Sequence, residues 1–269
     1  MKEKRRMHEA NLPGVAIIPG AEPFLLPSGD IGCLLIHGIS STPQQMRLMG
    51  EFLASRGITA HGVRLAGHGT RVEDLHETTY EDWIVSAEEG LSRLEERCSS
   101  VFCAGLSLGG ILSLRLARLY PERVRGVVTI CSSYRLRTFL FKLVPLVKGI
   151  MKKFPTGSSS INDPDVEEVK YSYHSVPAVY QLMKLNALVR EDLPHIGQPA
   201  LIFGARGDKV IDPEDQARYY DRIASSEKEL IWLDKSDHVA VLDYDKELVF
   251  EKTAAFINKH SAVPTVDRP

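Results

Sequence analysis

The chain has 269 residues, and 43% of them are hydrophobic, which is enough to bury one large core. This length suits either a single α/β domain with an insertion or two domains. The 33 basic and 35 acidic side chains leave a formal net charge of −2. A balance this close gives no electrostatic argument for binding nucleic acid or an anionic membrane surface.

The first residues, MKEKRRMHEANLPGVAIIPG, are basic but lack the continuous apolar segment that follows such a start in a signal peptide. No apolar run in the chain is long enough to span a bilayer. The four cysteines show no C-x-x-C spacing, and we expect buried free thiols of a reducing compartment at Cys33, Cys98, Cys103 and Cys131. These features predict a cytoplasmic protein without a stable membrane anchor.

Strand and helix patterns alternate from residue 31 onward. Residues 31–38, IGCLLIHG, are apolar and ended by glycine, which is typical of a strand covered on both faces. Residues 42–57 follow with proline at the first helical position and glycine as a stop. A second strand is expected at residues 58–67 and a second helix at 79–98. One face of that helix carries Trp83, Ala87, Leu91 and Leu94.

The alternation continues through the rest of the chain, apart from one interruption. Further strands are expected at residues 100–107, 124–134, 199–208 and 229–238, and helices at 108–120, 213–224 and 245–260. Parallel neighbours in a sheet need crossover connections, and helices of this length provide them. The pattern predicts an α/β fold with a mostly parallel, doubly wound sheet and helices on both faces.

Residues 135–196 interrupt the alternation. Prolines punctuate this segment, TGSSSINDPD is typical of a surface loop, and the remainder favours several helical pieces. Part of it is basic and amphipathic, with Phe139, Leu140, Leu143, Val144, Val147 and Ile150 lying among Lys142, Lys148, Lys152 and Lys153. We interpret 135–196 as a helical cap over the carboxyl ends of the strands, inserted into a core of residues 1–134 and 197–269. Transient contact of this cap with lipid stays open as a second interpretation.

The sequence GLSLGG, residues 105–110, follows a strand-like run and opens a helix. In a G-x-S-x-G elbow the serine occupies a sharp, strained turn between strand and helix, which exposes its oxygen. The flanking glycines are needed because the turn brings two backbones too close for a Cβ atom. The pentapeptide alone is a weak signal, and its glycines could simply close a turn. In this strand-to-helix context it favours Ser107 as a nucleophile.

A serine hydroxyl needs a base to remove its proton and an acid to orient that base. With such an elbow, the acid and then the histidine follow the serine in the chain, on loops after late strands. Asp208 and His238 meet this requirement. Asp212 and Asp237 are alternatives for the acid, although the first lies past the strand end and the second lies beside the histidine. Further histidines are less well placed. His8 and His260 lie near the termini, and His61, His68 and His76 precede the serine. A solvent-facing or structural role is expected for His174 and His195, which lie in the insertion.

The carbonyl oxygen that such a serine attacks becomes negative, so two hydrogen-bond donors must face it. The expected donors are two backbone N–H groups, one from the residue after the serine and one from a loop after an early strand. These are the amides of Leu108 and Ile39. Leu108 also stands at a helix N-terminus, where the helix dipole favours negative charge. We interpret His37, two residues before Ile39, as structural and bonded to nearby backbone.

Several stretches together resemble the α/β-hydrolase superfamily, and within it the monoacylglycerol lipases and small carboxylesterases of Bacillus-type bacteria. The matching stretches cover nearly the whole chain. They are GAEPF (20–24), LLIHG with the following TP, LAGHGT (65–70), DW (82–83), GLSLGG, NDPDVEE (162–168) and DHVAVLDYD (237–245). The chain departs from the family at Ile39, where a bulky aromatic residue is usual; the amide is unaffected, but the wall of the acyl pocket differs.

The resemblance implies a serine hydrolase that acts on short- to medium-chain acyl esters, including monoglycerides, in lipid metabolism. It assigns the same residues as the argument from the fold: Ser107 as nucleophile, Asp208 as acid, His238 as base and the Ile39 and Leu108 amides as oxyanion hole. The expected partner is a small-molecule ester, and no metal or organic cofactor is required. A thioesterase with the same triad and a non-catalytic ligand-binding member of the fold remain alternatives. An epoxide or haloalkane hydrolase is excluded because it would need aspartate at the elbow.

Overall fold

The computed structural model describes residues 16–135, 144, 151–157 and 160–261. Within these residues a seven-stranded sheet has the order β1-β3-β2-β4-β5-β8-β9, and every neighbouring pair is parallel except β1 with β3. Its strands are β1 (Phe24–Leu26), β2 (Ile31–Ile36), β3 (Ile58–Val63), β4 (Ser100–Leu106), β5 (Val124–Ile130), β8 (Ala200–Ala205) and β9 (Lys228–Leu233). The prediction of a mostly parallel α/β sheet is confirmed.

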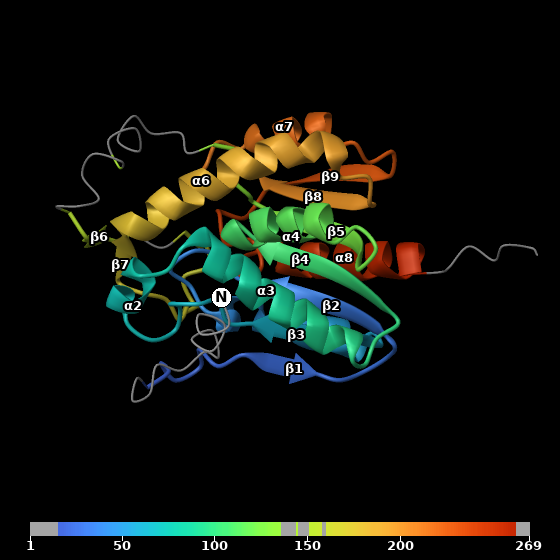
Figure 1. Ribbon diagram of the computed structural model, residues 1–269, viewed down its shortest axis with the longest axis horizontal. Helices are drawn as coiled ribbons and strands as arrows, with labels where there is room; N and C mark the ends of the chain where they lie inside the picture. Colours follow the sequence, from blue (N-terminus) through green and yellow to red (C-terminus); the bar gives the residue numbers. More distant parts are fainter. Residues whose placement is uncertain (1–15, 136–143, 145–150, 158–159, 262–269) are drawn as a thin grey trace, which may run out of the picture.

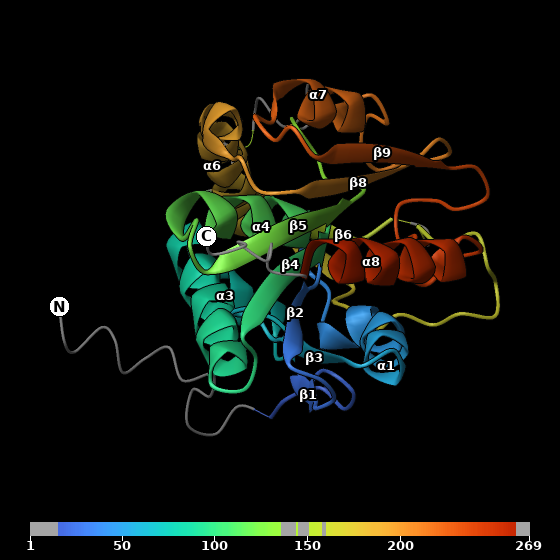
Figure 2. The ribbon, with the colours of Figure 1, turned by 90° about the vertical axis from the view of Figure 1, so that its right-hand side faces the viewer.

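Helices cover both faces of this sheet (Figures 1 and 2). One face carries α1 and α8, and the other carries α3, α4 and α6, each packed on its own hydrophobic cluster. The α-helices are α1 (Arg47–Ser55), α2 (Val72–His76), α3 (Tyr80–Glu95), α4 (Leu108–Leu119), α6 (Val176–Asp192), α7 (Asp215–Arg222) and α8 (Lys246–Ser261). Two 3₁₀ helices are η2 (Pro43–Met46) and η3 (Leu193–His195).

Strand β2 explains how the two hydrophobic clusters arise from one continuous apolar run. Successive side chains of a strand point to opposite faces of the sheet. Leu34 and Ile36 therefore join the cluster beneath α3 and α4, while Cys33 and Leu35 join the cluster beneath α1 and α8. All four of these side chains are completely buried. A strand in this position must be apolar on both faces, which is what its sequence shows.

The register of the parallel strands decides which loops meet. Ile36, the last residue of β2, pairs with Gly105 near the end of β4. Ala205, the last residue of β8, pairs with Leu233 at the end of β9. The loops that follow these strands consequently leave the sheet at the same edge, which is the left end of the molecule in Figure 1.

The predictions for the helices and the cysteine thiols are mostly confirmed, with two local differences in secondary structure. Trp83, Ala87, Leu91 and Leu94 are all fully buried, as the pattern of α3 predicts. All four cysteines are free and buried, again as predicted. The expected helix at 42–57 begins instead with the 3₁₀ helix η2, and strand β1 was not predicted because three residues carry too little periodicity.

The described part of the insertion is helical only in part. Val144, helix α6 and the 3₁₀ helix η3 are helical as predicted, but the antiparallel hairpin of β6 (Lys153–Pro155) and β7 (Tyr173–Ser175) before α6 was not predicted. Helix α6 packs against α3 and α4 on the flank of the sheet, whereas the hairpin lies near α2 at the carboxyl ends of the strands (Figure 1). The amphipathic stretch predicted at 139–150 lies outside the described residues except for Val144, which packs with Val176 and Val179.

The basic N-terminal stretch likewise lies mostly outside the described residues, which begin at 16. None of the helices that the structure describes is long and apolar enough to cross a membrane.

Candidate active site

Ser107 occupies the turn between β4 and α4 with an unusual backbone conformation. Its φ is +54° and its ψ is −114°, in a region that side-chain-bearing residues rarely adopt. A Cβ atom added to Gly105 would lie 2.1 Å from the carbonyl carbon of Gly109, and one added to Gly109 would lie 1.9 Å from the oxygen of Ile36. Neither glycine can be enlarged while this turn persists. The predicted reason for the two glycines is confirmed by these contacts.

Asp208 lies three residues beyond β8 and is held firmly by its own loop. Its Oδ1 atom accepts hydrogen bonds from the N–H groups of Val210 at 2.8 Å and Ile211 at 2.9 Å. Its Oδ2 atom remains for His238, whose Nδ1 lies 2.8 Å away. The structure therefore pairs the two residues that the sequence proposed as acid and base, and the loop amides fix the direction of the carboxylate.

The loop that carries His238 is braced by buried carboxylates. Asp237 accepts the N–H of His238 at 2.8 Å and pairs with the Nζ atom of Lys209 at 2.8 Å. Asp243 is completely buried and accepts the N–H of Asp237 at 2.8 Å. These acidic residues of DHVAVLDYD thus hold the loop around the histidine in place. Asp237, an alternative for the acid, binds the backbone of His238 and not its ring.

Electrostatics favour a charged His238. Burial lowers the pKa of this histidine, but the charge of Asp208 and the hydrogen bond to it outweigh burial, with further help from Asp237 and Glu168. The net result is a pKa above the ordinary value of 6.5. The imidazolium that forms when His238 accepts a proton is therefore stabilised by its surroundings.

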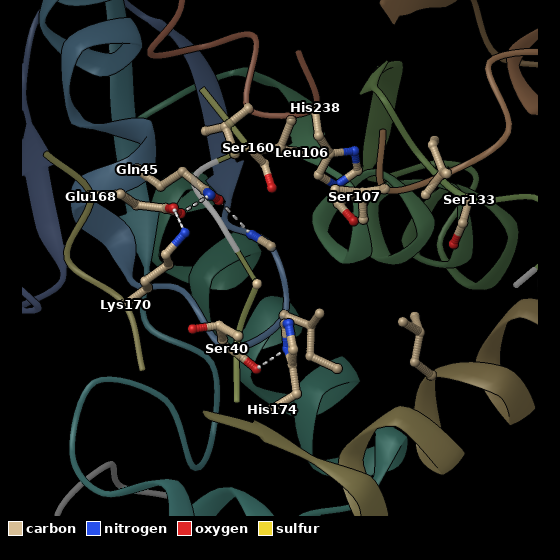
Figure 3. Close-up of a pocket in the computed structure, with 18 of the residues that line it drawn as sticks. Ser40, Gln45, Leu106, Ser107, Ser133, Ser160, Glu168, Lys170, His174 and His238 are labelled. Atoms are coloured by element: carbon tan, nitrogen blue, oxygen red, sulfur yellow. Dashed lines mark hydrogen bonds and ion pairs between the residues drawn. The ribbon is translucent and has the colours of Figure 1, made fainter. Parts of the chain in front are cut away.

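Ser107 and His238 face the same pocket, and the His238 ring lies beside the serine in Figure 3. The described contacts include no hydrogen bond from the Ser107 hydroxyl; in free enzymes such bonds often form only when substrate binds. The pocket has a volume of about 200 Å³. It is lined by Gly38, Ile39, Ser40, Gln45, Leu106, Ser107, Ser133, Phe154, Thr156, Gly157, Ser160, Glu168, Lys170, His174, Val179, Leu182, Val210, Ile211, His238 and Val239.

The two amides expected to face a developing oxyanion lie near the serine. Leu108 is the first residue of α4, and Ile39 follows β2, whose end lies beside the end of β4. A Cβ atom added to Gly38 would lie 3.7 Å from the Cβ atom of Ser107, which shows how close the two loops are. Among the described residues, neither the Ile39 nor the Leu108 N–H has a hydrogen-bond acceptor.

His37 has the structural role that its sequence context favours. Its Nδ1 atom lies 2.8 Å from the carbonyl oxygen of Gly38, and its Nε2 atom accepts the N–H of Leu65 at 3.3 Å. Burial lowers the pKa of His37 to about 4, because it outweighs the bond to Gly38 and acts with the charge of Arg64. The ring is therefore neutral near pH 7 and fully engaged with backbone.

One wall of the pocket was not predicted from the sequence. His174 was expected to be solvent-facing or structural, yet it lines the pocket and its Nδ1 atom lies 3.3 Å from the Ser40 hydroxyl. Phe154, across the hairpin, contacts the His174 ring with centroids 5.1 Å apart. His195 by contrast is exposed, as expected. Only the approximate alternation of KYSYHS hinted at a strand here, and nothing in it pointed to Ser40.

The remaining candidates lie elsewhere. Asp212, the other alternative for the acid, pairs with Arg218 at 3.2 Å. No group of three or more His, Cys, Asp or Glu side chains within the described residues is arranged to hold a metal ion.

Comparison with known proteins identifies the family. A family model described as serine aminopeptidase, S33, matches residues 30–245, which include the elbow, Asp208 and His238. The chain belongs to this family of α/β-hydrolases. The resemblance inferred from the sequence motifs is therefore confirmed at the level of the family and its fold.

Three relatives of this α/β-hydrolase have informative names. A thermostable monoacylglycerol lipase from Bacillus sp. strain H-257 is 37% identical over 91% of the chain and 97% of the lipase. A carboxylesterase from Bacillus subtilis strain 168 is 30% identical over 88% of the chain and 96% of the esterase. A solved structure from work on the metagenome-derived lipolytic enzymes LipS and LipT is 38% identical with a TM-score of 0.88, covering 91% of this chain and all of that one.

Proposed function

We propose that this α/β-hydrolase is a serine carboxylesterase that cleaves short- to medium-chain acyl esters, monoacylglycerols among them. Ser107 is the nucleophile, His238 the general base and Asp208 the residue that orients the base, with the Ile39 and Leu108 amides as oxyanion hole. The observation that carries the proposal is the 2.8 Å contact between Asp208 and the His238 ring, beside a serine held on a strained elbow. The lipase and carboxylesterase relatives support ester hydrolysis.

The proposed reaction has two steps. His238 takes the proton of the Ser107 hydroxyl as its oxygen attacks the ester carbonyl, and the alcohol leaves with that proton. Water then attacks the acyl-enzyme in the same way, with His238 again as base, and releases the acid. In each step the carbonyl oxygen becomes negative, and the two amides stabilise it because they are already in place.

The two sides of the pocket suit the two parts of an ester. Val179, Leu182, Val210 and Val239 offer apolar surface to an acyl chain, and each methylene buried there contributes about 0.8 kcal/mol. Polar side chains from the loop after β2 and from the insertion form another wall, suited to a hydroxylated alcohol. A pocket of about 200 Å³ favours short and medium chains over long ones. We propose on this basis that the insertion acts as the cap.

Lipid contact and cellular location form a separate part of the proposal. Met151 and Tyr173 are about half exposed on the hairpin of the insertion, beside the exposed Lys152 and Lys153. Apolar side chains next to lysines favour transient contact with a lipid surface that presents substrate. We also propose that the protein is located in the cytoplasm.

A hydrolysis panel tests the function. It compares p-nitrophenyl esters and 1- and 2-monoglycerides of increasing chain length with acyl thioesters and an aminoacyl p-nitroanilide. We expect the esters to be preferred, and the Ser107→Ala variant to lose about 10⁴- to 10⁶-fold in kcat while keeping its circular dichroism spectrum. A fluorophosphonate probe labels the native protein and not the variant. Preference for thioesters supports the thioesterase alternative, and an unlabelled, inactive native protein supports a non-catalytic member of the fold.

A further inference from the structure

The loop at residues 38–45, which we call the oxyanion loop, contains the Ile39 amide and lies outside the large sheet. Ser40, immediately after Ile39, has a φ of +62°, a conformation that costs free energy in a residue with a side chain. Within the loop, the N–H of Ser41 reaches the Gly38 oxygen at 3.4 Å and the N–H of Gln45 reaches the Thr42 oxygen at 3.1 Å, and neither bond involves Ile39. The path of the backbone at Ile39 therefore depends on side-chain bonds to its neighbours and on contacts from outside the loop.

Those contacts come from residues 168–174 of the insertion, which we call the clamp segment. The N–H of Tyr171 donates to the Ser40 oxygen at 2.9 Å, and the Thr42 hydroxyl donates to the Val169 oxygen at 2.8 Å. The Ser41 hydroxyl donates to Oε1 of Glu168 at 2.8 Å. The clamp segment thus follows the oxyanion loop closely, although the two are more than 120 residues apart in the chain.

Gln45 connects the clamp segment to the residue before Ile39. Its side-chain oxygen accepts the N–H of Gly38 at 2.8 Å, and its side-chain nitrogen donates to Oε1 of Glu168. Oε2 of Glu168 pairs with the Nζ atom of Lys170 at 3.0 Å. A carboxylate only accepts hydrogen bonds, so Glu168 forces the amide of Gln45 to present its oxygen to Gly38. Gln45 is 3% exposed, and Figure 3 shows the chain of contacts along one wall of the pocket.

We propose that Gln45 is a positioning residue, which Glu168 and Lys170 orient so that it sets the place of the Ile39 N–H through Gly38. The proposal rests on the proposed function, because it assumes that Ile39 faces an oxyanion. It gives the insertion a second role: besides covering the pocket, it completes the oxyanion hole. Gln45 itself touches no reacting atom in this scheme.

If Gln45 has only a structural role, its variants will show a different result from variants of a positioning residue. Loss of a structural contact lowers the melting temperature and leaves the turnover of the folded fraction unchanged. Displacement of an oxyanion donor lowers kcat and leaves KM nearly constant, because the donor acts mainly when charge develops. The two roles are therefore separated by a transition-state mimic and a ground-state mimic of the same chain length.

The test uses the full chain with the variants Gln45→Met, Gln45→Glu and Gln45→Glu/Glu168→Gln. Gln45→Met keeps the side-chain length but removes both polar contacts, and Gln45→Glu sets two carboxylates against each other. The double variant restores a donor facing an acceptor, because Gln at 168 donates to Glu at 45, which still accepts from Gly38. Gln198→Met is the matched control: the Gln198 side chain donates a hydrogen bond to the Ala117 oxygen at 2.8 Å and does not line the pocket.

We expect Gln45→Met to lower kcat on a p-nitrophenyl ester by about 10- to 100-fold with KM within about twofold, a smaller loss than removal of an oxyanion donor causes. Affinity for an alkyl trifluoromethyl ketone, whose adduct with serine carries an oxyanion, falls by the same factor, while affinity for the corresponding carbinol does not change. Gln45→Glu behaves similarly, and the double variant recovers most of the kcat. Gln198→Met retains the native kcat.

An unchanged kcat in folded Gln45→Met overturns the proposal, whatever happens to its melting temperature. Equal weakening of ketone and carbinol binding overturns it as well, because that pattern reports a general distortion of the pocket. If Gln45→Met does not fold, the comparison of Gln45→Glu with the double variant decides: no recovery of kcat contradicts the orienting role of Glu168. Failure of the proposed function is recognised separately, by native activity that is absent or independent of Ser107.

Discussion

The loops at the strand ends and the insertion build opposite sides of one pocket in different ways. Ser107 comes directly after β4, Asp208 three residues after β8 and His238 five residues after β9. Their relative positions follow from the register of the sheet, because short loops have little freedom. The clamp segment instead reaches the oxyanion loop through individual hydrogen bonds between distant parts of the chain.

The two regions are therefore expected to control different properties: the strand-end loops control the chemical step, and the insertion controls which substrates fit. The strand-end loops hold the groups proposed to make and break bonds, and two hydrophobic clusters beneath them resist distortion. The insertion contributes polar contacts and much of the pocket wall, where a change of side chain alters what fits. Substitutions in the first region are expected to abolish turnover, and those in the second to tune it.

The largest effect is expected at Asp208. Asp208→Asn keeps the size of the side chain but presents either an N–H group or a weaker acceptor to the His238 ring, so the productive tautomer is lost. We expect kcat to fall by about 10⁴-fold with the fold intact. Steady-state kinetics measures this loss. The comparison is Asp212→Asn, which changes the other acid in this stretch of chain. If the Asp212 variant loses activity and the Asp208 variant does not, the assignment of the acid is wrong.

Asp243 joins the two regions and is expected to give the next largest effect, on stability. Its Oδ1 accepts the N–H groups of Asp163 and Tyr244, and its Oδ2 accepts those of Asn162 and Asp237. Asparagine has only one acceptor oxygen, so Asp243→Asn leaves two N–H groups facing an NH₂ group at a completely buried side chain. We expect the free energy of unfolding to fall by about 2 to 4 kcal/mol.

Urea unfolding measures this change, with the exposed Asp165→Asn as a control expected to stay within about 0.5 kcal/mol of the native protein. Equal stabilities of the two variants would mean that the buried carboxylate does not hold the regions together.

The smallest effect is the dependence of activity on pH. A general base must be neutral, and the pKa of His238 is raised above 6.5 by Asp208 despite burial. We expect kcat/KM to fall about tenfold per pH unit on the acid side, with an inflection above pH 6.5. Because protonated His238 is favoured in the folded state, the same shift adds stability below pH 6.5 that is lost as the pH rises through the folded pKa. A profile with its inflection well below 6.5 contradicts this account.

Most of the sheet and the pairing of Asp208 with His238 were predictable from the sequence, for a physical reason. Strands covered on both faces are apolar throughout, and polar residues directly after them must lie at the carboxyl edge. The glycines around Ser107 carried a similar local signal. The three-residue strands β1, β6 and β7 gave no usable periodicity, so the prediction for the insertion contained helical pieces and a loop but no strands.

The wall formed by Gln45, Glu168 and His174 could not be predicted from the sequence. Each residue is ordinary in its local context: a glutamine near a helix start, a glutamate in an acidic stretch, a histidine in a segment with little pattern. Their roles depend on which segments the fold brings together across more than 120 residues. No periodicity or motif encodes such a meeting, whereas the strand-end residues needed only the order of the elements.

The backbone of Ser107 sets a limit on how this protein can be stabilised. Its conformation, with φ +54° and ψ −114°, costs about 1 to 3 kcal/mol in a residue with a Cβ atom, and the hydrogen bond from its N–H to the Ile130 oxygen at 2.8 Å helps to hold it there. Glycine would adopt the same conformation at no such cost. Heat resistance and reactivity therefore oppose each other at this residue, and selection of variants for thermal stability alone would favour loss of the proposed nucleophile.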